Sequence, residues 1–264
     1  MIVRFIIIFF FLFSPLFGET DKSKNDILYA NLVGAALITG WGAVNWDYGK
    51  SAPHASNEQW FGRYTKSGGA DKVGHMYASY FVATGLINMY ENWGYGNKEA
   101  VLYGSLSSFF LMNYMEAGDA FSNSLGFSYE DFIMNTLGSF SGYLFATYPD
   151  LSRRIDLRME YIPSLTTADL VTEYEKMKYI IAIKAEGFES ITNPYLQYGE
   201  LHLGYYTRHY TDGFSDESER VLYVGLGINF SRLARQSGYP TTGRLLNYYQ
   251  LPYTYLPFEK DMNR

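Results

Sequence analysis

The sequence predicts an α+β protein in which a bundle of about four apolar helices precedes a small C-terminal antiparallel β-region. Two observations support this prediction. The first half contains four long apolar stretches, whereas the second half alternates between apolar and polar residues. The change falls at Pro149, which is expected to stop the last helix. We therefore expect a signal peptide at 1–18, a helical bundle at 19–150, and a β-region with a surface tail at 151–264.

The first expected helix, residues 27–46, carries no charged residue, and its glycines allow close helix packing. The polar stretch 47–70 is expected to be a loop. Asp71 should then cap the second helix or lie in its first turn, where the helix dipole favours a negative charge. Short connections predict an up-and-down bundle, covered either by lipid or by protein. The remaining expected helices are 71–92, 97–117 and 128–148.

The second half shows the period-two alternation of half-buried strands, clearest at residues 154–161 and 221–232. In 221–232 an apolar face is backed by small and polar residues, which is typical of outer-membrane strands. Four strands cannot close a barrel alone, so we expect a small sheet on the bundle or at the membrane surface. The tail from Gly238 is expected to have little regular structure. The other expected strands are 178–188 and 197–211.

The N-terminal segment and the composition favour an exported protein. Arg4 precedes an apolar run and a break at Ser14-Pro15, as in a signal peptide, with an uncleaved anchor helix as the alternative. The absence of cysteine excludes disulfides, thiolate catalysis, cysteine-ligated zinc and lipidation of a cysteine. The net charge of -6 argues against nucleic acid as a partner. Aromatic residues make up 19% of the chain, which suits a membrane boundary. We expect a location in the cell envelope, either periplasmic or at the outer membrane.

Ionisable side chains recur at helical spacing inside the apolar stretches. Buried charges are costly unless they are paired, so these side chains predict either one polar site or contacts that hold the helices together. Asp71 lies one turn before His75 and can orient its imidazole as an acid, base or ligand. Glu116 and Asp131 are expected to complete this site. The candidate catalytic residues are therefore His75, Asp71, Glu116 and Asp131.

Three further polar residues are candidates for substrate binding. Lys72 can reach phosphate or headgroup oxygens, or it can be a solvated or capping residue. Asn135 can donate a hydrogen bond, or it can hold helices together, with Gly138 and Gly142 continuing its stripe. Asp119 shares a face with Glu116 and can instead cap the following turn.

His75, Glu116 and Asp131 together could also bind zinc or a harder ion, but no second histidine clusters with them, so no metal or cofactor is assigned. The other histidines, His54, His202 and His209, are expected at the surface.

The spaced set Asp71-Lys72-x-x-His75, Glu116 and Asp131-x-x-x-Asn135-x-x-Gly138 resembles that of the VanZ-like membrane family. It is more similar to the YfiM-type family of predicted periplasmic lipoproteins, a domain of unknown function. The resemblance covers roughly residues 27–150, and the run 223–229 is similar to the tail of such proteins. The chain differs from the lipoprotein family in having no lipidation cysteine. It differs from the VanZ-like pattern in having no Gln and Arg after the glutamate and in carrying a stranded tail. Neither resemblance implies a reaction.

These observations predict an exported, membrane-associated envelope protein whose polar pocket binds or acts on a membrane lipid or glycolipid headgroup. The alternative is a non-catalytic structural protein, in which the polar residues fix helix packing and the sheet contacts an envelope protein. A channel component is a weaker third alternative. The sequence leaves open whether the protein is an enzyme.

Overall fold

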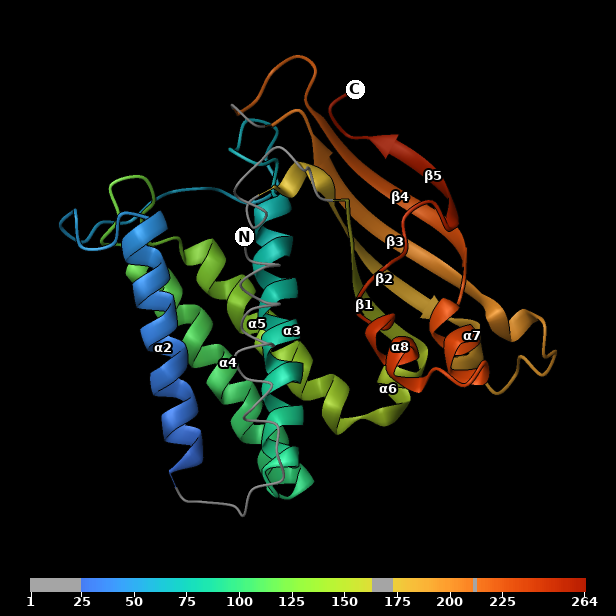
Figure 1. Ribbon diagram of the computed structural model, residues 1–264. Helices are drawn as coiled ribbons and strands as arrows, with labels where there is room; N and C mark the ends of the chain where they lie inside the picture. The colour runs from blue at the N-terminus through green and yellow to red at the C-terminus, as the bar shows by residue number, and fades with distance from the viewer. Residues whose placement is uncertain (1–24, 163–172, 211–212) are drawn as a thin grey trace. The chain divides into compact units, whose positions relative to one another are not determined.

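The computed structural model describes residues 25–162, 173–210 and 213–264. The predicted signal peptide at 1–18 lies outside these residues. Helices occupy the first part of the described chain and an antiparallel sheet occupies the second, which confirms the α+β fold class (Figure 1).

The chain divides into two compact units. The helical unit contains the described residues up to Gln59 and residues 78–147. The sheet unit contains residues 60–77 and the described residues from Tyr148 onward. Helix α3 begins in the sheet unit and continues without a break into the helical unit.

Four long helices lie close to their predicted ranges. Their apolar stretches are long enough to define them, and polar or glycine-rich loops separate them. The last of them ends one residue before Tyr148, and Pro149 then starts the short helix α6 (Pro149–Arg154), because proline is favoured in a first helical turn. The long helices are α2 (Asp26–Asn45), α3 (Ala70–Asn92), α4 (Asn97–Asp119) and α5 (Tyr129–Thr147).

Helices α4 and α5 bury small and polar residues and expose large apolar ones. This is the reverse of a water-soluble amphipathic helix. Among the described helices, α2 alone is long and apolar enough to cross a membrane by length and composition. The buried residues include Gly104, Ser108, Glu116, Asp131 and Asn135, and the exposed ones include Leu106, Phe109, Phe110, Leu137 and Phe140.

Two glycines let α3 approach its neighbours closely. A Cβ added at Gly104 of α4 would lie 2.6 Å from the backbone nitrogen of Ile87 in α3. A Cβ added at Gly142 of α5 would lie 2.5 Å from the Cβ of Ala83 in α3. Both distances are too short for a real Cβ, so glycine is required for this packing.

The sheet unit contains one five-stranded antiparallel sheet in the order β1-β2-β3-β4-β5, with its strands side by side in chain order (Figure 1). Five large apolar residues form one row across the sheet: Leu157, Ile181, Leu203, Val224 and Phe258. The strands are β1 (Ile155–Tyr161), β2 (Met177–Lys184), β3 (Gly199–Arg208), β4 (Glu219–Ile228) and β5 (Tyr255–Asp261). Short 3-10 turns at Tyr174–Lys176, Ala185–Gly187 and Leu196–Tyr198 precede or follow β2 and β3.

Two predictions about the C-terminal part are wrong. Strand β4 ends at Ile228, and helix α7 (Phe230–Gln236) follows because Asn229 caps it by accepting a hydrogen bond from the backbone of Arg232. The tail after Gly238 is not irregular. It forms helix α8 (Pro240–Leu245) and then the fifth strand, β5, which pairs with β4.

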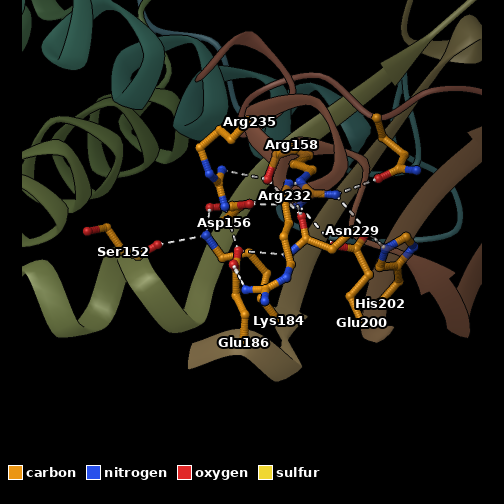
Figure 2. A network of polar contacts seen from close by, with 12 residues as sticks. Ser152, Asp156, Arg158, Lys184, Glu186, Glu200, His202, Asn229, Arg232 and Arg235 are labelled. Carbon is orange, nitrogen blue, oxygen red and sulfur yellow. Dashed lines mark hydrogen bonds and ion pairs between the residues drawn. The ribbon is translucent and has the colours of Figure 1, made fainter. Parts of the chain in front are cut away.

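The alternation in β1 was predicted correctly, but its charged face is the more buried one. Asp156 and Arg158 are almost fully buried and form an ion pair of 2.7 Å (Figure 2). Arg158 also binds Glu200 at 2.7 Å, and Lys184 binds Asp156 at 2.6 Å. Each of these acids therefore meets at least one cation, which is the condition for burying charges.

His202 corrects another prediction. It was expected at the surface, but it is fully buried and its Nε2 lies 2.7 Å from Glu200 (Figure 2). Its ring also packs edge-on against Tyr255, with the ring centroids 5.0 Å apart. His54 and His209 are exposed, as predicted.

Candidate functional site

Helices α3, α4 and α5 meet through a layer of polar contacts inside the helical unit. Asn135 of α5 donates to the backbone oxygen of Met112 in α4 at 3.2 Å and accepts from the hydroxyl of Ser79 in α3 at 3.0 Å. Asn135 and Ser79 are fully buried. In these contacts Asn135 holds the three helices in register.

A second layer lies one turn away. Ser108 of α4 donates to the backbone oxygen of Ser79 at 2.7 Å, and Ser139 of α5 donates to Ser108 at 3.1 Å. Contacts therefore pair Ser79 with Asn135 and, further along both helices, Ala83 with Gly142. Because both residue numbers increase together, α3 and α5 run parallel. Residue numbers on α4 fall as those on α5 rise, so α4 runs antiparallel to both.

Glu116 and Asp131 occupy the third layer. Glu116 lies one turn beyond Met112 on α4, and Asp131 lies one turn before Asn135 on α5. Glu116 accepts a hydrogen bond from the backbone N–H of Ser128, and the Ser128 hydroxyl accepts from the backbone of Asp131 at 3.2 Å. Ser128 therefore has two roles: its hydroxyl caps α5, and its backbone N–H binds Glu116 of α4. Both acids are at least 97% buried.

The electrostatics of this layer favour a protonated Glu116. Burial raises the pKa of its carboxyl to about 9, although the hydrogen bond from Ser128 acts in the opposite direction. The negative charges of Asp119, Asp131 and Glu58 raise it further. A carboxyl with this pKa holds its proton at neutral pH and can donate a hydrogen bond or a proton.

Two acids near this site were not predicted. Glu58, in the loop before α3, contributes to the raised pKa of Glu116. Glu130 is fully buried beside Asp131, and its Oε2 accepts a hydrogen bond from Ser128 at 3.1 Å. Its position before the apolar part of α5 is the signal that the sequence offered, because acids are common in a first helical turn.

The predicted residues Asp71, Lys72 and His75 lie in the first turns of α3, in the part that belongs to the sheet unit. Lys72 is fully buried, with its Nζ 2.9 Å from Asp71 Oδ2, so a solvated lysine is excluded. His75 is partly buried. Asp71 is in the first turn, as predicted.

Asp119, the last residue of α4, packs against the loop after α2. The hydroxyl of Tyr48 lies 2.7 Å from its Oδ1 and 2.8 Å from the backbone oxygen of Met115. Burial, and then the charge of Asp119, raises the pKa of this phenol well above its ordinary value, so Tyr48 stays a hydrogen-bond donor. The contact fixes the end of α4 near Glu116.

The fold and this layer define an α+β protein with a buried acidic group between helices. Residues 57–147, roughly a third of the chain, match the model of a family described as predicted periplasmic lipoprotein (DUF2279), a domain of unknown function. The match contains every candidate residue from Asp71 to Asn135. It agrees with the predicted exported location in the cell envelope. No curated protein and no solved structure matches the chain.

Proposed function

We propose that this protein is a membrane-associated envelope protein in which His75, Asp71, Glu116 and Asp131 form one polar site for the headgroup of a lipid or glycolipid. The observation that supports it most strongly is the register of helices α3, α4 and α5. Ser79 of α3 and Asn135 of α5 are hydrogen-bonded to each other and so define one level of the helices.

The register extends to His75 through the continuity of α3. Because α3 and α5 run parallel, a step of one turn back on each leads from Ser79 to His75 and from Asn135 to Asp131. On the antiparallel α4, a step of one turn forward from Met112 leads to Glu116. From this helical spacing we infer one imidazole and two carboxyls as the groups of the site.

Such a site can perform proton transfer on a polar headgroup. Glu116, with a pKa of about 9, is an acid that can donate to a phosphate or sugar oxygen. In the proposal His75 is the acid, base or ligand, Asp71 orients it, and Asp131 accepts a hydrogen bond from the headgroup. The same proposal assigns a cation, an amide and a carboxylate for binding to Lys72, Asn135 and Asp119.

The apolar outer surface of α4 and α5 supports an amphiphilic substrate. Large aliphatic and aromatic side chains are exposed there, among them Leu106, Phe110 and Phe140. Exposed apolar patches of this kind mark membrane or protein interaction sites. In the proposal, the chains of the lipid contact this surface and its headgroup reaches Glu116 in the last turn of α4 and Asp131 in the first turn of α5.

Nuclear magnetic resonance of the histidine ring tests the proposal. Dihexanoyl phosphatidylglycerol, kept below its micelle concentration, is expected to shift the ring signals of His75 in the full chain. Asp131→Asn should weaken this shift at unchanged fold, and His54→Ala is the matched control because His54 is exposed. The proposal is contradicted if the probe does not shift the His75 signals, or if it shifts them equally in Asp131→Asn and His54→Ala.

A metal ion is a second occupant that the same donors suit, since zinc accepts imidazole and carboxylate ligands. Titration with zinc chloride tests this occupant separately. Tight zinc binding that is lost in His75→Ala and retained in His54→Ala would assign a metal centre instead of a headgroup site.

A non-catalytic structural role is the second candidate function. The contacts of Ser79, Ser108, Asn135 and Ser139 favour it, because they tie three helices together through polar groups. If the role is structural, Asp131→Asn lowers the unfolding midpoint, and the shift of the His75 signals by the probe is small both before and after the substitution. If the residues form a headgroup site, Asp131→Asn changes the shift of the His75 signals more than it changes the unfolding midpoint.

A further inference from the structure

The sheet unit contains a groove of about 510 Å³ that the polar site does not use. Its lining comes from the first turns of α3 and from the apolar row of the sheet, including Met76, Tyr77, Ile181, Leu203, Val224 and Phe258. Ligand pockets typically measure roughly 300–1,000 Å³ and are mainly apolar. The size and the lining of this groove are those of a ligand site.

Three of the four tyrosines in the lining have their hydroxyl groups bound to protein. The hydroxyl of Tyr77 donates to the backbone oxygen of Tyr248 at 2.6 Å, and the hydroxyl of Tyr205 donates to the backbone oxygen of Gly68. The hydroxyl of Tyr179 contacts the sulfur of Met177 at 3.3 Å. These three tyrosines therefore offer ring carbon to the groove, which disfavours a sugar or a nucleotide as the ligand.

Two cationic residues belong to the lining, Arg158 and Lys260, and Arg158 is buried and paired with Asp156 and Glu200. Lys260 of β5 lines the groove and is exposed, so its ammonium group can reach a charged ligand at the surface. The groove opens along the sheet, where Val224 is 45% and Phe258 is 66% exposed. An elongated apolar ligand with one anionic end matches this arrangement of charge and surface.

We propose that this groove binds one long hydrocarbon chain of an anionic amphiphile, with the anionic end at Lys260. The site is independent of the proposed headgroup site. Val73, Met76 and Tyr77 share one face of α3, whereas Asp71 and His75 lie on another. Failure of either proposal therefore leaves the other intact.

Binding of cis-parinaric acid, whose fluorescence rises in an apolar environment, tests the groove in the full chain. Val224→Gln should weaken binding about tenfold, or about 1.4 kcal/mol, because it places an amide in the apolar lining. Leu226→Gln is the matched control: it lies on the same strand and face but outside the groove lining, and should bind normally. Equal loss in both variants shows nonspecific adsorption to the sheet and overturns the proposal.

The charged end has its own test. Lys260→Gln should weaken displacement of the probe by palmitate severalfold and leave displacement by hexadecanol nearly unchanged. Equal effects on both competitors would show that Lys260 does not bind the anionic end. If the protein associates with intact phosphatidylcholine vesicles but does not bind free palmitate, the sheet is a membrane-contact surface. That result overturns the proposal that the groove binds a single hydrocarbon chain.

Discussion

The helical unit and the sheet unit both bury polar side chains, but they neutralise them differently. In the sheet unit, Arg158 contacts both Asp156 and Glu200, and Lys184 contacts Asp156. In the helical unit, the charges that act on Glu116 from Asp119, Asp131 and Glu58 are all negative. Opposite charges close the first network, whereas like charges accumulate in the second.

The pKa values follow this difference only in part, because burial raises the pKa of Asp156 even though Arg158 and Lys184 act to lower it. In the sheet unit, burial acts to raise the pKa of Glu186, but hydrogen bonds and charges from Arg232 and Arg235 bring it below its ordinary value. In the helical unit, burial and neighbouring acids raise the pKa of Glu116 to about 9. Paired acids of this kind stabilise a fold, while an acid with a strongly raised pKa is a candidate for function.

The largest effect is expected from breaking the closed network. Arg158→Met leaves Asp156 and Glu200 buried without their shared cation, and should lower the free energy of unfolding by about 3–5 kcal/mol. Urea unfolding followed by circular dichroism measures it. Arg153→Met is the control, because the pairs of Arg153 with Asp150 and Glu189 are exposed and contribute about 0–1 kcal/mol. Similar losses in both variants would contradict a specific role for the buried network.

The sequence predicted the helices well but not which sheet face is buried. Alternation in β1 shows that Asp156 and Arg158 share a face, and an apolar core was the natural expectation for the other face. The burial of the charged face depends on Glu200 and Lys184, which lie on strands far away in the chain. His202 was missed for the same reason, although Glu200 two residues earlier on the same strand face was an available signal.

The candidate site was predictable in part. The one-turn spacing of Asp131 and Asn135 correctly indicated a buried stripe on α5. The serines that fix the helix register carry no distinctive spacing, so nothing in the sequence pattern singles out Ser79, Ser108 and Ser139. Strand β5 was missed because its pairing with β4 is a long-range contact and Pro257 interrupts the strand pattern.

The second prediction concerns the pH dependence that Glu116 adds. Its pKa is raised from 4.5 to about 9, so the folded state holds a proton that the unfolded state loses. This contribution to stability is complete below about pH 4.5 and falls as pH rises toward about 9. Glu116→Gln should remove this slope and raise the free energy of unfolding at pH 8 by about 1–3 kcal/mol.

Urea unfolding at pH 5 and pH 8 measures this effect. Glu189→Gln is the control, because this side chain is 88% exposed and should change neither value. If Glu116→Gln destabilises the protein at pH 8, a cation lies beside the ionised carboxylate, and the helical unit resembles the sheet unit after all.

The third prediction separates close helix packing from helix propensity. Gly104→Ala places a Cβ 2.6 Å from the backbone nitrogen of Ile87, and should cost about 1–3 kcal/mol as α3 and α4 move apart. Gly40→Ala in α2 meets nothing within 4 Å and should stabilise by about 0.5–1 kcal/mol. Thermal unfolding of both variants checks the signs. Stabilisation by both substitutions would mean that α3 and α4 do not pack this closely.

The smallest effect is expected at the cap of α5. Ser128→Ala removes the hydroxyl that accepts from the backbone of Asp131 and should cost about 1 kcal/mol, while Ser128→Gly should cost only a few tenths. Both variants keep the backbone N–H that donates to Glu116, so the pKa of Glu116 should stay near 9. Carboxyl-carbon nuclear magnetic resonance measures that pKa. A fall of this pKa to an ordinary value in Ser128→Ala would mean that the cap itself keeps water from Glu116. The raised pKa would then depend on local structure at the start of α5 rather than on the packing of three helices.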